Sequence, residues 1–297
     1  MSYHEPVLLQ ESIDALAIVP GGTYVDATFG GGGHSKEILK RLQGGKLFAF
    51  DQDTDSMNNS TADKRLTLIN HNFRYLKRFL RFHDALRVNG IIADLGISSH
   101  QIDDPLRGFS TRHEGIPDMR MNRRIGTLTA ERIINTYPAE WLQRVLSEYG
   151  ELSGAGRITE AILSARPITT TLDLKGAVAR FAGGRKENQF HAKLFQALRI
   201  EVNDELNALK DLLVQSAEVL VKGGRIVIIS YHSLEDRLVK TFFSKGKFGG
   251  ETEKDIYGNP LAVPFRPLTR KPVLTPDAEV ERNPRARSAK MRIAEKI

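Results

Sequence analysis

Three aspartates in the first third of the chain have the type and spacing to bind a nucleoside. Asp26, Asp51 and Asp94 each follow a short segment rich in β-forming residues. In an open α/β sheet, ligands bind outside the carboxyl ends of the parallel strands. A carboxylate there accepts hydrogen bonds from ribose hydroxyls or from an amine. We therefore expect the three acids to lie at one edge of a sheet, around one bound molecule.

Four consecutive glycines, Gly30 to Gly33, separate the first of these acids from a segment with helical periodicity. Glycines in a turn from strand to helix let a ligand approach the backbone N–H groups closely. Asp51 lies twenty-one residues after Gly30, a separation typical of the acid that binds ribose hydroxyls in nucleotide-binding sheets. The glycine turn is therefore predicted to hold a ribonucleoside cofactor.

The glycine pattern bears on which cofactor this is. The dinucleotide fingerprint G-x-G-x-x-G/A is only partly matched, because Gly30 and Gly32 are followed by Ser35 at the third position. S-adenosylmethionine has no pyrophosphate and does not need a complete anion-binding turn. An acid before the glycines and a second acid after the next strand is the pattern of its sites. We favour S-adenosylmethionine, with an NAD-dependent oxidoreductase as the alternative.

Asp94 is the candidate for catalysis, and the chemistry it suits is methylation of an exocyclic amine. The lone pair of such an amine is delocalised into the base. A carboxylate and a backbone carbonyl that accept the two N–H hydrogens turn this lone pair toward the methyl group. Asp94 with the carbonyl of Leu95 or Gly96 offers that pair; the alternative is an aspartate that only caps a turn. The chain has no cysteine, which excludes methylation of a pyrimidine C5 through a thiolate and leaves an exocyclic nitrogen or a ribose hydroxyl.

Three residues with ring side chains are further candidates for contact with the substrate or the cofactor. Tyr231 and His232 follow the predicted strand 223–230 and are placed to stack on, or hydrogen-bond to, an extruded base; a structural histidine is the alternative. Phe73 follows another predicted strand and suits either an adenine ring or the core. The eight histidines show no metal-ligand spacing, so we expect no metal.

The elements that must position these residues follow from periodicity. Strand-like and helix-like segments alternate over the first hundred residues, which predicts parallel βαβ units in a doubly wound sheet. From residue 128 to 221 only helical periodicity is found, and strand-like segments then resume. The pattern predicts an α/β sheet domain interrupted by an all-helical insert, with boundaries 1–104, 105–205 and 206–297. The predicted strands are 23–28, 46–53, 65–72, 90–99, 223–230 and 288–296; the predicted helices are 6–16, 34–42, 74–82, 139–150, 158–165, 172–182, 192–220 and 234–244.

Composition and charge bound the class of protein. Of 297 residues, 40% are hydrophobic and 27% charged, as in soluble globular proteins. No apolar run approaches twenty residues and no signal peptide is recognised, so we expect a cytoplasmic protein without contact with a membrane. The net charge is +7, and arginines gather at 107–124 and after 281. Because the guanidinium fork suits phosphate, these clusters favour a nucleic-acid partner over solvated surface charge.

Seven strings, spread in order from His4 to Glu295, resemble the MraW/RsmH family of bacterial methyltransferases. That family uses S-adenosylmethionine to methylate N4 of a cytidine in small-subunit ribosomal RNA. The resemblance implies a Rossmann-like methyltransferase sheet, a helical insert that recognises the substrate, and a cytidine in the decoding region. The strings are HEPVLLQES, DATFGGGGHSKEIL, DLGISSHQIDDPLRGFS, PDMRMN, FQALRIEVNDEL, IVIISYHSLEDRLVK and NPRARSAKMRIAE.

The resemblance also implies particular contacts. The substrate would be ribosomal RNA, free or in an assembled small subunit, and a homodimer is possible; a non-catalytic RNA-binding or assembly factor is the alternative. Two strings depart from the family, NQFHAKLFQALRI and TRHEGIPDMRM, and they bear on RNA contacts more than on cofactor binding. The implied cofactor contacts are Gly32, Gly33, His34, Asp51, Phe73, Asp94 and Gln101. The candidate RNA contacts are Arg107, Phe109, Arg120, Arg123, Arg124, Arg285 and Arg287.

Overall fold

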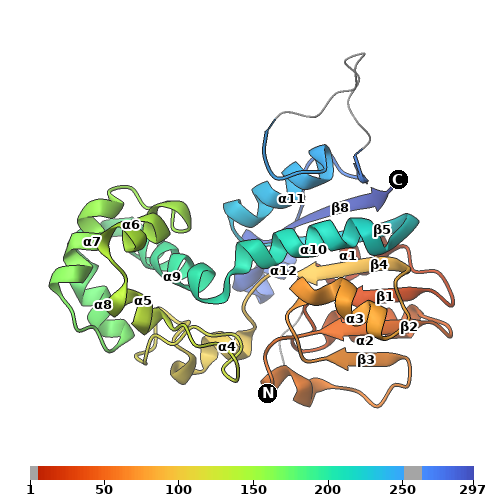
Figure 1. The fold of residues 1–297 in the computed structure, drawn as a ribbon, viewed down its shortest axis with the longest axis horizontal. Coiled ribbons are helices and arrows are strands. Elements are labelled where there is room, and N and C mark those ends of the chain that lie inside the picture. Colours follow the sequence, from red (N-terminus) through yellow and green to blue (C-terminus); the bar gives the residue numbers. More distant parts are fainter. Residues whose placement is uncertain (1–5, 251–262) are drawn as a thin grey trace. The chain divides into compact units, whose positions relative to one another are not determined.

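The computed structural model describes residues 6–250 and 263–297 (Figure 1). It divides into two compact units, which we call the sheet unit (1–96 with 206–297) and the helical unit (97–205). The units divide after residues 96 and 205, whereas the sequence placed the first boundary after residue 104. His4 and Glu5, which begin the first family string, lie outside the described residues.

The sheet unit is built on one sheet with strand order β3-β2-β1-β4-β5-β8-β6. The first five strands along the chain are parallel to their neighbours, whereas β8 runs antiparallel beside β5 and pairs with β6 and β7. The predicted Rossmann-like α/β fold is therefore confirmed. The strands are β1 Thr23–Asp26, β2 Lys46–Phe50, β3 Leu66–Ile69, β4 Val88–Asp94, β5 Leu220–Ser230, β6 Phe265–Pro267, β7 Val273–Leu274 and β8 Lys290–Lys296.

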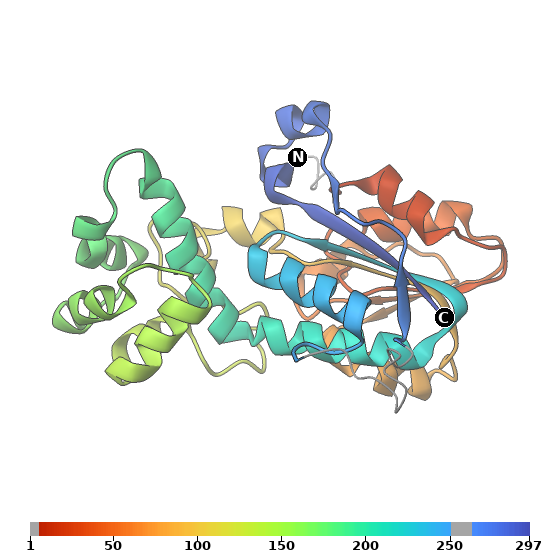
Figure 2. The ribbon, with the colours of Figure 1, turned by 90° about the horizontal axis from the view of Figure 1, so that it is seen from above.

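Helices cover both faces of this sheet (Figure 2). Alternate residues of β5 point to opposite faces, so Ile226 and Ile228 pack in one core cluster and Val227 and Ile229 in the other. Helices α3, α10 and α11 complete the first cluster, and α1 and α2 complete the second. These helices are α1 Leu9–Leu16, α2 Gly33–Arg41, α3 Leu76–Phe82, α10 Glu205–Val219 and α11 Ser233–Lys245, with the short α12 Asp277–Arg282 before β8.

The register of the strands brings their carboxyl ends to one edge. Asp26 of β1 lies opposite Ala49 of β2 and Ile92 of β4, and Asp94 lies opposite Ile229 of β5. The residues that follow these strands therefore share one side of the sheet, as the sequence predicts for the three acids.

The helical unit has its own core, formed by residues of five helices and of the segment before them. Pro138 and Gly154 directly precede two of its helices, α6 and α7. The predicted continuous helix over 192–220 is wrong: α9 ends at Asn203 and α10 begins at Glu205, because Asp204 adopts a left-handed φ of 49°. Aspartate tolerates this conformation and it ends a helix. The helices of this unit are α4 Ser99–Asp103, α5 Ala130–Thr136, α6 Ala139–Glu148, α7 Ala155–Ser164, α8 Thr171–Val178 and α9 Glu187–Asn203.

Helix length and polarity also bear on membranes. The longest helix within residues 6–250 and 263–297 is α9, with 17 residues. Among the helices of these two ranges, none combines the length and the apolar character that crossing a membrane requires.

Candidate active site

The glycine turn between β1 and α2 has a backbone that favours glycine. Gly30 and Gly32 have φ values of 50° and 74°, in the left-handed region. A Cβ on Gly32 would lie 2.8 Å from Cζ of Phe29, and one on Gly33 would lie 2.0 Å from Cγ of Pro6. Helix α2 starts directly after this turn, and no side chain of the described residues caps it. The Gly32 N–H donates to the carbonyl oxygen of Phe29 at 2.7 Å, so the Gly33 N–H at the start of the helix is the group left open to a ligand.

Asp51 links the end of β2 to the glycine turn. Its Oδ2 accepts a hydrogen bond from the Gly30 N–H at 2.7 Å, and its Oδ1 accepts one from the Asp53 N–H at 2.8 Å. The side chain keeps some exposed surface, yet burial is the largest influence and raises the pKa of Asp51 to about 6. Each carboxylate oxygen retains a lone pair, so this group suits two neighbouring ribose hydroxyls.

Asp26 has its oxygens occupied by the chain itself. Its Oδ1 accepts a hydrogen bond from the Thr28 N–H at 3.0 Å, and its Oδ2 accepts one from the Ser35 hydroxyl at 2.7 Å. The side chain is buried, and burial raises its pKa. Asp26 therefore ties the end of β1 to the first turn of α2 and shapes the glycine turn.

Asp94 closes β4 and is held from two sides. Its Oδ1 accepts a hydrogen bond from the Tyr231 hydroxyl at 2.7 Å, and its N–H donates to Oγ1 of Thr28 at 2.7 Å. Burial raises the pKa of Asp94, while the charge of His34 and the Tyr231 hydrogen bond oppose the rise. The second oxygen, Oδ2, accepts no hydrogen bond within residues 6–250 and 263–297. The sheet unit thus brings Asp94 and Tyr231 together, with one carboxylate oxygen not engaged by the described residues.

The predicted cofactor contacts fall into both units. His34 is buried in α2 with its Nε2 3.2 Å from the carbonyl oxygen of Val7. Phe73 begins a short 3-10 turn, Phe73–Tyr75, and packs against the core beneath α3. Gln101 lies in the helical unit, where it forms a capping box with Ser98 at the start of α4. Six predicted contacts lie in the sheet unit, and they are Gly32, Gly33, His34, Asp51, Phe73 and Asp94.

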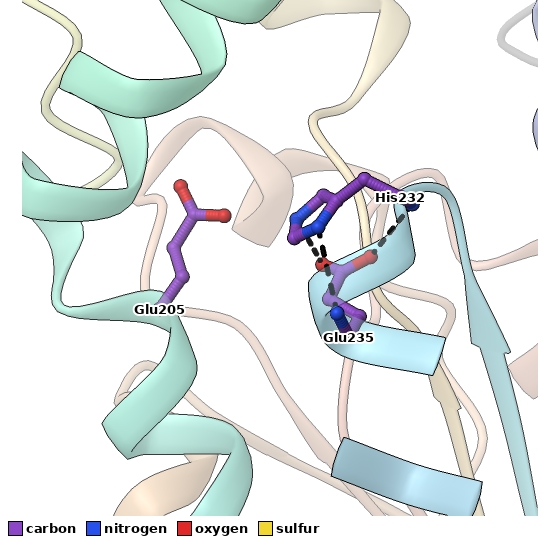
Figure 3. A group of neighbouring side chains, drawn as sticks. All are labelled: Glu205, His232 and Glu235. Atoms are coloured by element: carbon purple, nitrogen blue, oxygen red, sulfur yellow. Dashed lines mark hydrogen bonds and ion pairs between the residues drawn. The ribbon is translucent and has the colours of Figure 1, made fainter. Parts of the chain in front are cut away.

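His232 begins helix α11 (Figure 3). Its side chain accepts a hydrogen bond from the Glu235 N–H, and the Glu235 carboxylate accepts one from the His232 N–H. His232 Nε2 lies 3.2 Å from Oε1 of Glu235, without the direction of a hydrogen bond. These contacts give His232 a capping role. Glu205, also drawn in Figure 3, forms an ion pair with Arg199 of the helical unit.

Part of the predicted RNA-binding set is turned inward. Arg107 is buried, donates to the carbonyl oxygens of Arg120 and Met121, and lies over the ring of Phe109, which is also buried. Arg120 forms a two-bond ion pair with Asp118. The predicted contact of Arg107 and Phe109 with RNA has no support from these positions, because both side chains hold the segment 105–126 in place.

The other predicted RNA contacts are exposed. Arg123 and Arg124 project from the same segment of the helical unit, and Arg123 also contacts the carboxylate of Asp118. Arg285 and Arg287 lie on an exposed 3-10 turn, Pro284–Ser288, ahead of β8. Four of the seven candidates therefore have accessible guanidinium groups.

Three residues of the site escaped the sequence analysis. Thr28 accepts from the Asp94 N–H, Ser35 donates to Asp26, and Glu235 accepts from the Tyr231 N–H at 2.9 Å. Thr28 and Ser35 bracket the glycine run and carry no signal beyond that position. Glu235 had one, since a glutamate three residues after a helix start is typical of a capping box.

Comparison with known proteins identifies the family. A family model described as the MraW methylase family matches residues 1–297. The chain belongs to the MraW methylase family. Among its relatives, "Ribosomal RNA small subunit methyltransferase H" of Flavobacterium johnsoniae is 54% identical over 301 residues, covering 100% of this chain and 99% of that protein. The protein of the same name from Bacteroides thetaiotaomicron is 51% identical over 300 residues, covering 100% and 98%.

Solved structures give weaker likenesses. A putative methyltransferase from Streptococcus mutans in complex with SAH is 13% identical, with a TM-score of 0.41, covering 99% of this chain and all of that one. A likeness of this size carries no argument about function.

Family membership confirms the predicted class of enzyme, a methyltransferase that takes its methyl group from S-adenosylmethionine. The residues fit this cofactor. The tight glycine turn starts helix α2 with no side-chain cap, and Asp51 offers acceptor oxygens beside Gly30 of the same turn. The NAD-dependent alternative is therefore set aside.

Proposed function

We propose that this chain transfers the methyl group of S-adenosylmethionine to the N4 amine of a cytidine in the decoding region of small-subunit ribosomal RNA. Relatives that match the whole chain are named as methyltransferases of this RNA, which supports ribosomal RNA as the substrate. The observation that carries the choice of an amine is Asp94, a carboxylate at the sheet edge with one oxygen held by Tyr231 and the other unoccupied by the chain.

Cofactor binding falls to the glycine turn and Asp51. The backbone N–H of Gly33, at the start of α2, suits the carboxylate of an amino acid, and the oxygens of Asp51 suit ribose hydroxyls. When bound, the cofactor supplies a methyl group already activated by a positively charged sulfur. The chain needs only to orient the acceptor and to exclude water, so no covalent intermediate with the protein is required.

Asp94 and a neighbouring carbonyl orient the acceptor. Oδ2 of Asp94 accepts one N–H hydrogen of the cytosine amine, and the carbonyl of Leu95 or Gly96 accepts the other. With both hydrogens held, the nitrogen lone pair turns out of conjugation and toward the methyl group. The amine loses a proton after transfer, when the positively charged product is acidic enough to release it to water.

The RNA backbone meets the exposed arginines. Arg124, Arg285 and Arg287 present guanidinium groups to solvent and suit phosphates, which makes affinity fall steeply with salt. We further infer that the chain works in the cytoplasm, where its substrate is either free RNA or an assembled small subunit. A homodimer stays a prediction.

A single-turnover assay tests the proposal. The purified chain is mixed with S-adenosylmethionine carrying a labelled methyl group and with small-subunit RNA, or small subunits, from a strain lacking the gene. The RNA is then digested to nucleosides and examined by mass spectrometry. We expect the label in N4-methylcytidine. Label in another nucleoside, or none with either substrate, would refute the assignment of the cytosine amine.

A further inference from the structure

The contact between Tyr231 and Asp94 joins two neighbouring strand ends. Asp94 closes β4 opposite Ile229 of β5, and Tyr231 follows the end of β5. The Tyr231 ring lies beside Gly96, where a Cβ would come within 3.1 Å of Cε2. The ring therefore fills the space next to the residues proposed to grip the amine, and its hydroxyl reaches Oδ1 of Asp94.

Glu235 in turn fixes Tyr231. Its Oε2 accepts a hydrogen bond at 2.9 Å from the N–H of Tyr231, which lies two residues before the start of α11. The Glu235 side chain is 4% exposed, and a buried carboxylate is costly unless its oxygens are satisfied. Oε2 also accepts a hydrogen bond from the His232 N–H, and Oε1 lies 3.2 Å from Nε2 of His232, so the carboxylate holds the turn between β5 and α11 in place.

We propose that Tyr231 and Glu235 are positioning residues for methyl transfer: Glu235 fixes the backbone of Tyr231, and the Tyr231 hydroxyl holds Oδ1 of Asp94 so that Oδ2 faces the amine. This inference rests on the proposed function. It differs from the sequence-based expectation that Tyr231 contacts the base, because the hydroxyl is engaged by the chain itself.

The hydrogen bond has two chemical consequences. A carboxylate held at one oxygen cannot rotate, so the amine finds its acceptor in place and no reorganisation precedes transfer. A phenol that donates to a buried carboxylate also favours its ionised form. The other groups facing Asp94 are His34 from α2, Asp26 from β1 and Glu235 from α11, and Glu279 of α12 faces Tyr231.

Tyr231→Phe removes the hydroxyl and keeps the ring. Loss of a group that orients a functional residue typically lowers activity about 10- to 100-fold, so we expect kcat to fall by that amount while KM for S-adenosylmethionine stays unchanged. The acidic limb of the kcat profile should also move to higher pH, because Asp94 loses a donor that holds its pKa down. A purely structural role for the hydroxyl would not move that limb.

Tyr24→Phe is the matched control. Tyr24 is a buried tyrosine whose hydroxyl also makes one hydrogen bond, with the Val19 N–H at 2.8 Å, at the opposite end of β1 from Asp26. The Tyr24→Phe variant should lose stability without a change in the pH profile of kcat. If Tyr231→Phe matches the wild type in both kcat and its acidic limb, the positioning role is refuted.

Glu235 has its own pair of variants. Glu235→Gln retains an oxygen that accepts from the Tyr231 N–H and should keep most activity, whereas Glu235→Ala should reproduce the loss seen in Tyr231→Phe. Thermal unfolding identifies any Glu235 variant that fails to fold. In that case Tyr231→Phe and its control Tyr24→Phe test the positioning role. Failure of the proposed function is distinguishable, because the wild type itself would then leave cytidine unmethylated.

Discussion

The acids at the edge of the sheet and the arginines of residues 107–124 make an instructive comparison. Both sets were predicted from residue type and clustering. The structure brings Asp51 and Asp94 to one edge beside the glycine turn, as expected. In the arginine segment, by contrast, Arg107 is buried and Arg120 is paired with Asp118. Residue type predicted where a side chain lies only when regular structure fixed its position.

The physical difference lies in the backbone. A residue that ends a parallel strand has its place set by the sheet register, whatever its side chain is. A guanidinium in an irregular segment has five N–H donors and can satisfy them with nearby carbonyls or a carboxylate. Arg107 donates to two backbone carbonyls, and Arg120 donates to the carboxylate of Asp118. Each prediction below tests one side of this contrast.

Asp94→Ala should have the largest effect. Removal of the acceptor for the amine should lower kcat about 10³-fold at saturating cofactor, while the thermal midpoint is retained because burial already penalises the charged carboxylate. Asp14→Ala, at an exposed ion pair with Arg41, should keep full activity. Equal activity of the two variants would contradict the role of Asp94.

Gly32→Ala should weaken cofactor binding at least about tenfold, since a Cβ would strain the left-handed backbone and strike the Phe29 ring. Gly44→Ala is the matched control, with a φ of 82° and open space around the Cβ. Gly44→Ala should lose about 1 kcal/mol of stability, and Gly32→Ala should lose more because of its contact with the Phe29 ring; urea unfolding measures both. Calorimetric titration should detect a weaker affinity in the first variant alone, and equal affinities would refute a ligand at the glycine turn.

Asp51 should make cofactor binding depend on pH. Its pKa is raised to about 6, so the dissociation constant should rise up to about tenfold per unit as the pH falls below 6. The stability of the cofactor-free chain should follow the opposite trend. A carboxyl with a raised pKa destabilises the fold when ionised, so its share of the stability is lost as the pH rises from about 4 to 6. Asp51→Asn should abolish the binding trend and weaken the stability trend, to which Asp26 and Asp94 also contribute through their raised pKa values. Persistence of the binding trend in this variant would assign it to another group.

Arg124→Ala and Arg107→Ala should separate the two kinds of arginine. Removal of the exposed Arg124 guanidinium should weaken RNA binding a few-fold and reduce the salt slope of binding by about 0.7. Removal of the buried Arg107 guanidinium should lower the stability of the helical unit by about 2 kcal/mol and leave the salt slope unchanged. Filter binding at several salt concentrations, with thermal unfolding, measures both. A reduced slope for Arg107→Ala would show that it reaches phosphate after all.

The same contrast explains how much could be predicted from the sequence. Apolar runs such as 226–229 predicted the parallel sheet, and the acids that follow the strands predicted the edge at which they gather. The break at Asp204 was missed because nothing in the apolar spacing interrupts it. The short strands β6 and β7 were missed because pairing with β8, not their own two or three residues, defines them. Contacts between distant segments, such as Tyr231 with Asp94, leave no local pattern.

A crystal structure with S-adenosylhomocysteine and cytidine monophosphate tests the central claim most directly. We expect the ribose on Asp51, the amino-acid end at the glycine turn, and the cytosine amine within hydrogen-bonding distance of Oδ2 of Asp94. A nucleoside bound away from the glycine turn, or a cytosine whose amine faces other groups, would contradict the account.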